Sequence, residues 1–411
     1  MTSHFQWPLT YASRGTGACS PCGIARPKQE CKAFFSGTLF GHPAPGEVGS
    51  SVDTFGRNRI IAARGHVPAH RYDNAEIMAA VRGLFPDSES VPFGDEVIGR
   101  VFGNSGVRTR YTSVPLEALS PRPVEQALAR QREEVVEQSV TAVREVMDEL
   151  ELAPERVDML ATTSYTALGA PSLDVEIATA LGLRTDVRRV SMPAAGCSGG
   201  GAMTGRMHDH LLAHPDQLAV GVVCDLPYFL FGTGPMTMTR LVESALFGDG
   251  CGVIVMAGAG RTGAPAPGPW VVDAHSAFIP GTRHMAGWSV GEQGLRTFLE
   301  PGTAEIFEAA APPAVGSLLG RHGVKAGDIG AWICHPGSAK VLDHVARGLG
   351  VDRGAFQVSY DVLAQRGNMV GATVVHILQE VNATPPPEGT LGVLMAFGPG
   401  LSCELALLQW D

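Results

Sequence analysis

Short apolar runs alternate with helix-like segments over most of the chain, and this alternation restricts the fold more than any other feature. The first half contains four apolar runs typical of buried strands, at 157–162, 189–194, 218–224 and 251–256. Helical patterns lie before and between them, at 74–84, 123–150, 174–181 and 197–214. Strands and helices in this order pack as alternating layers. The sequence therefore predicts an α/β fold.

The second half repeats the same kinds of element. It contains a strand pattern at 270–278, another at 331–334 and a closing hairpin of strands at 391–397 and 403–408. Helical patterns lie at 304–322, with an interruption at Pro312 and Pro313, and at 339–349 and 368–381. The segment 264–269 (APAPGP) has the composition of a linker. We expect two halves, 57–263 and 264–411, after a poorly ordered extension at 1–56 that is rich in Gly, Pro and Ser.

Composition limits the classes of partner. Charged residues make up 18% of the 411 residues, below the typical share of about 25%, which favours a large core or a buried subunit interface. The formal net charge of −10 disfavours nucleic acid and membrane surfaces as partners. There is neither an apolar run long enough to span a membrane nor a signal-peptide pattern. We expect a cytoplasmic protein whose eight cysteines are reduced thiols.

Two groups of residues were considered as metal sites. The extension contains three cysteines and two histidines that could be ligands: Cys19, Cys22, Cys31, His4 and His42. Their spacing matches no zinc pattern well. His210 and His214 share a helix face, but the glutamate of a zinc-protease motif is missing between them. We therefore expect no metal.

Cys197 is the first candidate for a nucleophile. It lies in the run AAGCSGGGA, where a strand ends and a helix begins, so backbone N–H groups would favour its thiolate. A cysteine at a glycine-rich packing point is the structural alternative. Two other enzyme classes also fit. Gly196–Gly200 matches the G-x-S-x-G elbow of serine hydrolases through Ser198, and the order Cys, His, Asn also occurs in papain-like proteases, whose local motif is absent.

Two later residues could act with Cys197. His335 follows an apolar strand and precedes Pro-Gly, so the end of the strand would present its imidazole. Asn368 opens an apolar helix. Each also has an ordinary structural explanation, as a strand-end histidine and as a helix cap.

The surroundings of these residues resemble the chalcone synthase and stilbene synthase family of type III polyketide synthases. The resemblance covers about 59–410 and is carried by eight stretches: NSGVRTRY at 104–111, TTS at 162–164, PSLD at 171–174, the Gly-Cys elbow, LFGDG at 246–250, WICHPG at 332–337, RGNM at 366–369 and FGPGL at 397–401. It implies a five-layer α-β-α-β-α thiolase fold with two pseudo-repeated halves, usually as a homodimer. Coenzyme A thioesters would be substrates, and no cofactor is implied.

The resemblance also implies roles for the candidate residues. Cys197, paired as thiolate with a protonated His335, would take up a starter acyl group. His335 and Asn368 would hold the enolate that forms when malonyl-CoA loses carbon dioxide. Phe247 matches a gatekeeper between the coenzyme A tunnel and the cavity, and Asp249 shapes the turn after it. The positions expected to line the cavity are Thr163, Ser164, Tyr228, Leu230, Phe231, Thr297, Ser338, Val370, Phe397, Gly398 and Pro399.

Several positions depart from the plant pattern. Thr297 stands where the family has a second gatekeeper, and Val370 replaces a serine. Tyr228 and Phe231 are bulkier than the plant residues, which predicts a small cavity and a pyrone or resorcinol product. Arg100, Arg108 and Lys340 are candidates for the coenzyme A phosphates. The alternatives are a condensing enzyme like ketoacyl synthase III, a thioester hydrolase using Cys197 or Ser198, and a catalytically silent dimeric partner.

Overall fold

The computed structural model describes residues 56–84, 93–118, 123–230, 236–261, 268–291 and 294–411, without the side chains at 84, 229, 230, 290, 291 and 294–296. The chain divides into two units, Met1–Val48 and Gly49–Asp411, and every described residue belongs to the second. The cysteines and histidines of the extension and most of the expected linker lie outside the described residues. No described helix is both long enough and apolar enough to cross a bilayer.

The strands form one large sheet and two small hairpin-like pairs. In chain order they are β1 (Asn58–His66), β2 (His70–Asp73), β3 (Thr109–Thr112), β4 (Met159–Thr163), β5 (Arg188–Ser191), β6 (Leu218–Asp225), β7 (Gly250–Ala257), β8 (Trp270–Phe278), β9 (Ala286–Gly291), β10 (Gly294–Leu299), β11 (Ile329–Cys334), β12 (Leu391–Gly398) and β13 (Ser402–Gln409). Strands β2 and β3 pair with each other, as do β9 and β10. The remaining strands follow the order β11-β12-β13-β8-β1-β7-β6-β4-β5.

The large sheet consists of two halves with the same strand directions. In the first half β4 runs parallel to β6, and β6, β7 and β1 follow antiparallel to one another. In the second half β11 runs parallel to β12, and β12, β13 and β8 follow antiparallel. Only a short pairing of Asn58 and Arg59 with β8 joins the halves. The structure therefore confirms two pseudo-repeated halves, in which β1, β4, β6 and β7 correspond to β8, β11, β12 and β13.

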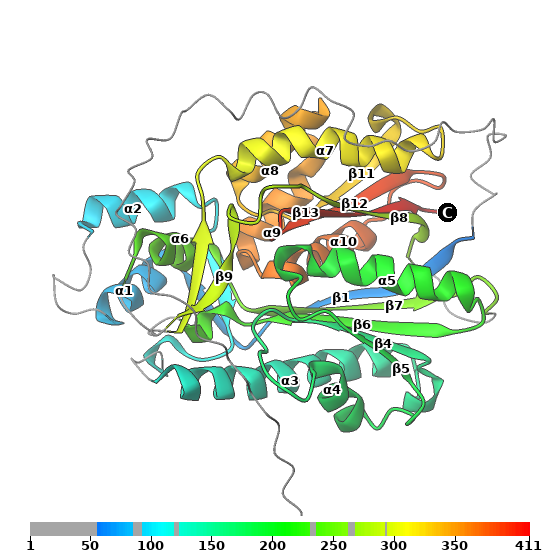
Figure 1. Ribbon diagram of the computed structural model, residues 1–411, viewed down its shortest axis with the longest axis horizontal. Coiled ribbons are helices and arrows are strands. Elements are labelled where there is room, and N and C mark those ends of the chain that lie inside the picture. Colours follow the sequence, from blue (N-terminus) through cyan, green and yellow to red (C-terminus); the bar gives the residue numbers. More distant parts are fainter. Residues whose placement is uncertain (1–55, 85–92, 119–122, 231–235, 262–267, 292–293) are drawn as a thin grey trace, which may run out of the picture. The chain divides into compact units, whose positions relative to one another are not determined.

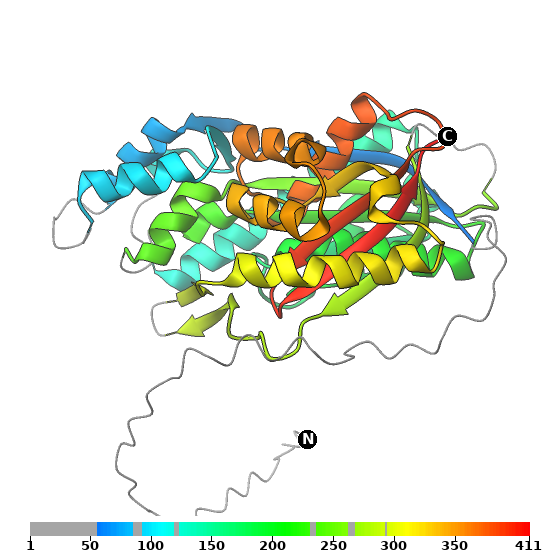
Figure 2. The same cartoon turned by 90° about the horizontal axis from the view of Figure 1, so that it is seen from above.

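Helices complete five layers (Figure 1). They are α1 (Asn74–Leu84), α2 (Asp95–Asn104), α3 (Val124–Glu149), α4 (Leu173–Leu181), α5 (Gly199–Ala213), α6 (Met238–Leu246), α7 (Thr303–Gly320), α8 (Ala339–Leu349), α9 (Gln357–Arg366) and α10 (Thr373–Ala383). Helices α3 and α4 cover one outer face and α7 and α8 the other, while α5 and α10 lie between the two halves of the sheet (Figure 1). Seen from above, α7 lies across β13 (Figure 2), and it packs against both β8 and β13. This is the expected α-β-α-β-α arrangement.

The central helix α5 needs its glycines because the turn before α10 and strand β13 approach it closely. A Cβ on Gly200 would lie 2.5 Å from the Gly371 carbonyl oxygen, and one on Gly201 would lie 2.9 Å from the Cβ of Glu404. Such separations are shorter than packed atoms allow. Further along α5, Met203, Met207 and Leu211 are fully buried. The glycine run predicted as an elbow therefore also lets the central layer pack.

Most expected elements are confirmed, including β8 and α8 with the predicted bounds and the closing β12–β13 hairpin. Three details differ. Helix α7 continues through Pro312 and Pro313, where an interruption was expected. Cys197 lies in a short 3-10 turn, Gly196–Ser198, ahead of α5 rather than inside it. Asn368 also precedes its helix, because a turn at Val370–Ala372 separates it from α10.

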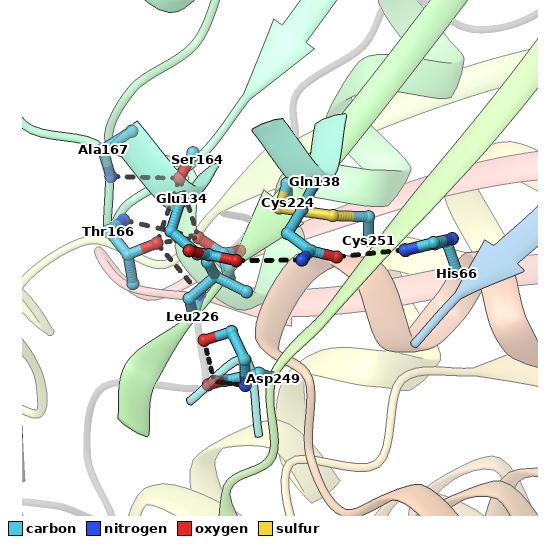
Figure 3. Close-up of a disulfide and its surroundings, with 12 residues drawn as sticks. His66, Glu134, Gln138, Ser164, Thr166, Ala167, Cys224, Leu226, Asp249 and Cys251 are labelled. Atoms are coloured by element: carbon cyan, nitrogen blue, oxygen red, sulfur yellow. Dashed lines mark hydrogen bonds between the residues drawn. A yellow bond between two sulfur atoms is a disulfide. The ribbon is translucent and has the colours of Figure 1, made fainter. Parts of the chain in front are cut away.

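The expectation that all cysteines are reduced is wrong for one pair. Cys224 of β6 and Cys251 of β7 face each other in the antiparallel register and are joined by a disulfide (Figure 3). Direct opposition on neighbouring strands brings the two side chains together, which spacing along the sequence does not reveal. Cys197, Cys334 and Cys403 are free.

Candidate active site

Cys197 is presented by a turn between a strand and the central layer. The preceding residue, Gly196, has a φ of +53°, a left-handed conformation that favours glycine. A Cβ there would also come within 3.0 Å of the Pro399 ring. The turn Gly196–Ser198 then leads into α5, and the Cys197 side chain is half-buried. The glycine thus fixes the direction in which the thiol points.

Burial keeps the Cys197 thiol protonated in the absence of substrate. Its pKa is raised to about 12, first by burial and then by the negative charge of Asp225, although a hydrogen bond with Asn368 acts in the opposite direction. Asp225 is itself buried and accepts hydrogen bonds from Tyr165 N at 2.8 Å and Ser164 Oγ at 3.3 Å. Burial thus opposes the thiolate that the helix N-terminus was expected to favour.

His335 continues the line of β11. Its backbone N–H donates to the Met395 carbonyl at 2.8 Å, so the strand pairing extends to the histidine. The residue is 1% exposed, and neither ring nitrogen has a hydrogen-bond partner among the described residues. Burial lowers the pKa of His335 to about 3, so the ring is neutral. A neutral imidazole with two unused nitrogens can accept one proton and donate another.

Both the oxygen and the nitrogen of the Asn368 side-chain amide form hydrogen bonds with the backbone. Its Oδ1 accepts the Val370 N–H at 2.8 Å, and its Nδ2 donates to the Gly337 carbonyl at 3.2 Å, two residues after His335. Val370 has a φ of +52°, which is unusual for a β-branched residue and concentrates backbone strain beside the site. The cap expected at Asn368 is thus replaced by a bridge between two loops.

Cys197 and Asn368 occupy equivalent places in the two halves. Each lies in the turn ahead of a central helix, α5 for the cysteine and α10 for the asparagine. His335 lies at the end of β11, the strand that corresponds to β4. The pseudo-repeat therefore explains why residues so far apart in the sequence approach each other.

Phe247 ends helix α6, where its backbone N–H donates to the Glu243 carbonyl at 2.9 Å. A backbone bridge connects Phe247 with Asn368. Asp249 closes the turn after it: it is fully buried and accepts the N–H groups of Ser113 at 2.9 Å and Tyr228 at 3.0 Å. Burial raises the pKa of Asp249 to about 7. These contacts fit the structural role expected for Asp249.

The candidate residues surround one cavity of about 470 Å³. Of the predicted positions, those on its wall are Cys197, His335, Asn368, Phe247, Thr297, Ser338, Lys340, Val370, Phe397, Gly398 and Pro399. Most of the remaining wall is apolar, with Trp288, Phe298 and Phe307 among its larger side chains. The motif-based residues thus converge on a single chamber.

Several predicted wall positions lie elsewhere. Thr163 donates to the Met192 carbonyl at 3.0 Å and faces the backbone of α5, and Ser164 bonds Asp225 behind Cys197. The Tyr228 hydroxyl donates to the Ser244 carbonyl at 3.1 Å inside a separate core, so Tyr228 does not narrow the cavity. Phe231 and the Leu230 side chain lie outside the described residues.

The coenzyme A candidates separate into two groups. Lys340 lies on the cavity wall and pairs with Glu305 at 3.4 Å. Arg100 and Arg108 are exposed and do not line this cavity, and Arg100 pairs with Glu96 on its own helix. Their role stays a prediction.

Glu243 and Tyr165 are among the polar residues of the wall that were missed from the sequence. Glu243 accepts a hydrogen bond from the Thr297 hydroxyl, and Tyr165 lies close enough for Glu243 and Cys197 to raise the pKa of its phenol after burial, the larger cause. A signal for Glu243 existed, because it precedes Phe247 by four residues and so shares its helix face. Thr297, which stands at the position of the second gatekeeper, forms a polar pair with Glu243.

Family models match both halves of the chain. The model for the N-terminal domain of chalcone and stilbene synthases matches residues 48–260, and that for the C-terminal domain matches residues 271–410. Together they cover the described elements, including the three residues that meet at the cavity.

Similar proteins of known function support the same family. A 1,3,6,8-tetrahydroxynaphthalene synthase of Streptomyces peucetius subsp. caesius is 35% identical over 376 residues, which cover 89% of this chain and 97% of the relative. An alpha-pyrone synthesis polyketide synthase-like protein, Pks18 of Mycobacterium tuberculosis, is 27% identical over 347 residues, covering 82% and 87%.

A solved structure has the same fold. The 1,3,6,8-tetrahydroxynaphthalene synthase from Streptomyces coelicolor A3(2), a bacterial type III polyketide synthase, superposes with a TM-score of 0.78 at 28% identity, covering 86% of this chain and 99% of that one. With both family models matched and a cysteine, a histidine and an asparagine around one chamber, the chain belongs to the chalcone and stilbene synthase family of type III polyketide synthases.

Proposed function

We propose that this acyltransferase extends an acyl-CoA starter with malonyl-CoA, or a substituted malonyl-CoA, on Cys197, and cyclises the product to a pyrone or a phenolic ring. One observation carries the proposal: Cys197, His335 and Asn368, from three separate segments, line one chamber together with Phe247. A nucleophile, a proton carrier and an amide donor are the groups that a decarboxylative condensation requires.

Loading begins with a neutral pair. Because burial raises the pKa of Cys197 and lowers that of His335, a thiol and an uncharged imidazole face the incoming thioester. The Cys197 proton moves to a ring nitrogen of His335 as Sγ attacks the acyl carbonyl carbon. The carbon–sulfur bond to coenzyme A then breaks, and the coenzyme A thiolate takes the proton from His335. The protonated His335 therefore exists only while the acyl group is being transferred.

Extension uses the same chamber. Malonyl-CoA loses carbon dioxide, and its electron pair becomes an enolate whose oxygen receives hydrogen bonds from His335 and from Nδ2 of Asn368. The enolate carbon attacks the acyl carbonyl, and the Cys197–acyl bond breaks. Since Val370 N–H holds Oδ1 of Asn368, the donor end of the amide is oriented before substrate arrives.

Two features support the choice of substrates and assembly. Lys340 on the cavity wall is a cation suited to a coenzyme A phosphate on an otherwise acidic chain. Strand β5 lies at the edge of the large sheet, with backbone groups that a second copy of the chain could pair. We therefore propose a homodimer, which analytical ultracentrifugation tests directly: a monomer at micromolar concentration would contradict it.

A hydrolase mechanism with Ser198 as the nucleophile is not favoured. Ser198 is 4% exposed, its hydroxyl donates to the Ala195 carbonyl at 2.8 Å, and it does not line the cavity. Its Oγ therefore points away from the chamber where a substrate would bind.

The test is incubation of the purified protein with malonyl-CoA and a panel of acyl-CoA starters. Condensation yields carbon dioxide and ketides whose masses differ by two-carbon units, while hydrolysis yields only free acids and free coenzyme A. Detection of hydrolysis products alone, with every starter, would overturn the proposal.

A further inference from the structure

Glu243 is a carboxyl group inside an otherwise mainly apolar chamber. It lies on α6, four residues before Phe247, so both side chains project from the same helix face toward the cavity that they line. A carboxyl in such a place costs solvation free energy that must be offset by a partner. Its position therefore requires an explanation beyond packing.

One oxygen of Glu243 has a partner within the protein. Thr297 of β10, which lies beside α6 on the same wall, donates its hydroxyl to Oε1. This bond fixes the carboxyl in place, because α6 and β10 belong to different parts of the chain. Arg240, one turn earlier on α6, contributes an attractive charge. Among the described residues no hydrogen bond reaches Oε2, which leaves its lone pairs to a molecule in the cavity.

Tyr165 places this carboxyl near the reacting thiol. Its backbone N–H is anchored at 2.8 Å on Asp225, and its ring lies on the cavity wall. Both Glu243 and Cys197 act electrostatically on its phenol. Cys197, Tyr165 and Glu243 line the same cavity, so an acyl group attached to Cys197 can extend past Tyr165 toward Glu243.

We propose that Glu243, held by Thr297, is a starter-selecting subsite for acyl-CoA thioesters that carry a hydroxyl group on an otherwise apolar chain. This inference rests on the proposed function, which it extends by naming the class of starter. The apolar wall accommodates the hydrocarbon part, and the free oxygen of Glu243 accepts a hydrogen bond from the hydroxyl group.

A hydroxyl group suits this site better than a charged group. Burial raises the pKa of Glu243, so the carboxyl is easier to protonate than a surface glutamate. A hydroxyl can donate to the carboxylate and accept from the carboxylic acid, so it pairs with either form. A starter carboxylate held beside Glu243 would be repelled by its ionised form, in a chamber whose wall also contains Glu300 and Glu305.

The test compares two starters that differ by one oxygen: 3-(4-hydroxyphenyl)propionyl-CoA and 3-phenylpropionyl-CoA. The readout is the rate of acyl-Cys197 formation, followed by mass spectrometry of the intact protein without malonyl-CoA. We expect kcat/KM for loading of the hydroxylated starter to be at least about tenfold higher, because a site built for a hydroxyl discriminates against its absence.

Variants test whether the preference for the hydroxylated starter comes from Glu243. Glu243→Leu should reduce the ratio of the two rates to about one, and Thr297→Val should lower it through the displaced carboxyl. Glu137→Leu, an exposed position on α3, serves as the matched control and should retain the ratio. Because the ratio is measured within one preparation, partial misfolding of a variant affects both starters equally.

The outcomes distinguish a failure of the Glu243 subsite from a failure of the proposed function. Equal loading of both starters by the unmodified protein, or an unchanged ratio in Glu243→Leu, overturns the subsite while the proposed function stands. Absence of acyl-Cys197 with both starters, and with acetyl-CoA and malonyl-CoA, overturns the proposed function and the subsite with it.

Discussion

Phe247 and Asn368 are joined backbone to backbone by an isolated parallel bridge, in which Gly248 N–H donates to the Asn368 carbonyl at 3.0 Å and Asn368 N–H donates to the Leu246 carbonyl at 2.9 Å. The residue proposed as the gate and the residue proposed to hold the enolate are therefore mechanically linked. Displacement of one segment must move the other. This coupling connects entry of the substrate to the geometry of the reaction.

Replacement of Cys197 separates attachment of the chain from generation of the enolate. Cys197→Ala should abolish ketide formation, because no acyl group can be held on the protein. Cys197→Gln should retain release of carbon dioxide from malonyl-CoA, since His335 and Asn368 remain in place. Product chromatography and trapping of labelled carbon dioxide measure the two activities, and full product formation by Cys197→Ala would refute the assignment of the nucleophile.

Asn368→Ala should slow decarboxylation and extension by about a hundredfold or more while leaving the loading of Cys197 measurable. The reason is that one donor to the enolate oxygen is lost, whereas loading uses the thiol and the imidazole. Asn104→Ala, at an exposed position near the end of α2, is the control. An equal loss in loading and in extension would indicate a structural rather than an electrostatic role.

Asp225→Asn should make Cys197 more reactive above about pH 6. The carboxyl of Asp225 has a pKa raised to about 6 by burial, so it is charged above that pH and then opposes ionisation of the thiol. Asparagine retains an oxygen that can accept from Tyr165 N–H but has no negative charge. The rate at which iodoacetamide alkylates Cys197, followed by peptide mass spectrometry, should be higher in Asp225→Asn than in the unmodified protein above pH 6. Below pH 6 the two rates should be equal.

The same substitution should alter how stability depends on pH. The folded protein retains the Asp225 proton up to about pH 6, whereas the unfolded chain releases it near pH 4, so raising the pH between these values favours unfolding. The stabilising contribution is complete below pH 4 and is lost as the pH rises through 6. Denaturant titrations should give a wild-type minus Asp225→Asn difference that falls over this window by on the order of 1–3 kcal/mol. A flat difference would contradict the raised pKa.

Gly196→Ala and Gly182→Ala form a matched pair. Both glycines have left-handed backbones, with φ of +53° and +67°, so each substitution should cost about 1 kcal/mol of folding free energy. Only at Gly196 would the new methyl group meet another residue, Pro399 at 3.0 Å, while Gly182 faces open space. Thermal unfolding should shift in both variants, but loading of Cys197 should fall only in Gly196→Ala. Normal loading in Gly196→Ala would show that the turn tolerates displacement.

Local pattern predicted the alternating strands and helices and the places of the candidate residues, while the five-layer arrangement was implied by the family resemblance. Buried strands such as β6 are continuous apolar runs, and Cys197 and His335 lie where strand patterns end. The wall of the cavity was harder to predict. Thr163 ends β4 and Ser164 follows it, yet they face α5 and Asp225, because side-chain direction depends on how the layers stack. Glu243 was missed for the same reason: its importance depends on Thr297 from a distant hairpin.

The crowded glycine face of α5 has a consequence for changing the product. The floor of the chamber, at Cys197 and Val370, is backed by backbones that come together at Gly200 and Gly371, so selection or engineering can hardly deepen it. The opposite wall, made by α6 and the β9–β10 pair, packs through side chains that can be exchanged one at a time. Substitutions that change the length of the product are therefore expected to accumulate on that wall. The rigid floor keeps the attachment end of every growing chain at the same place.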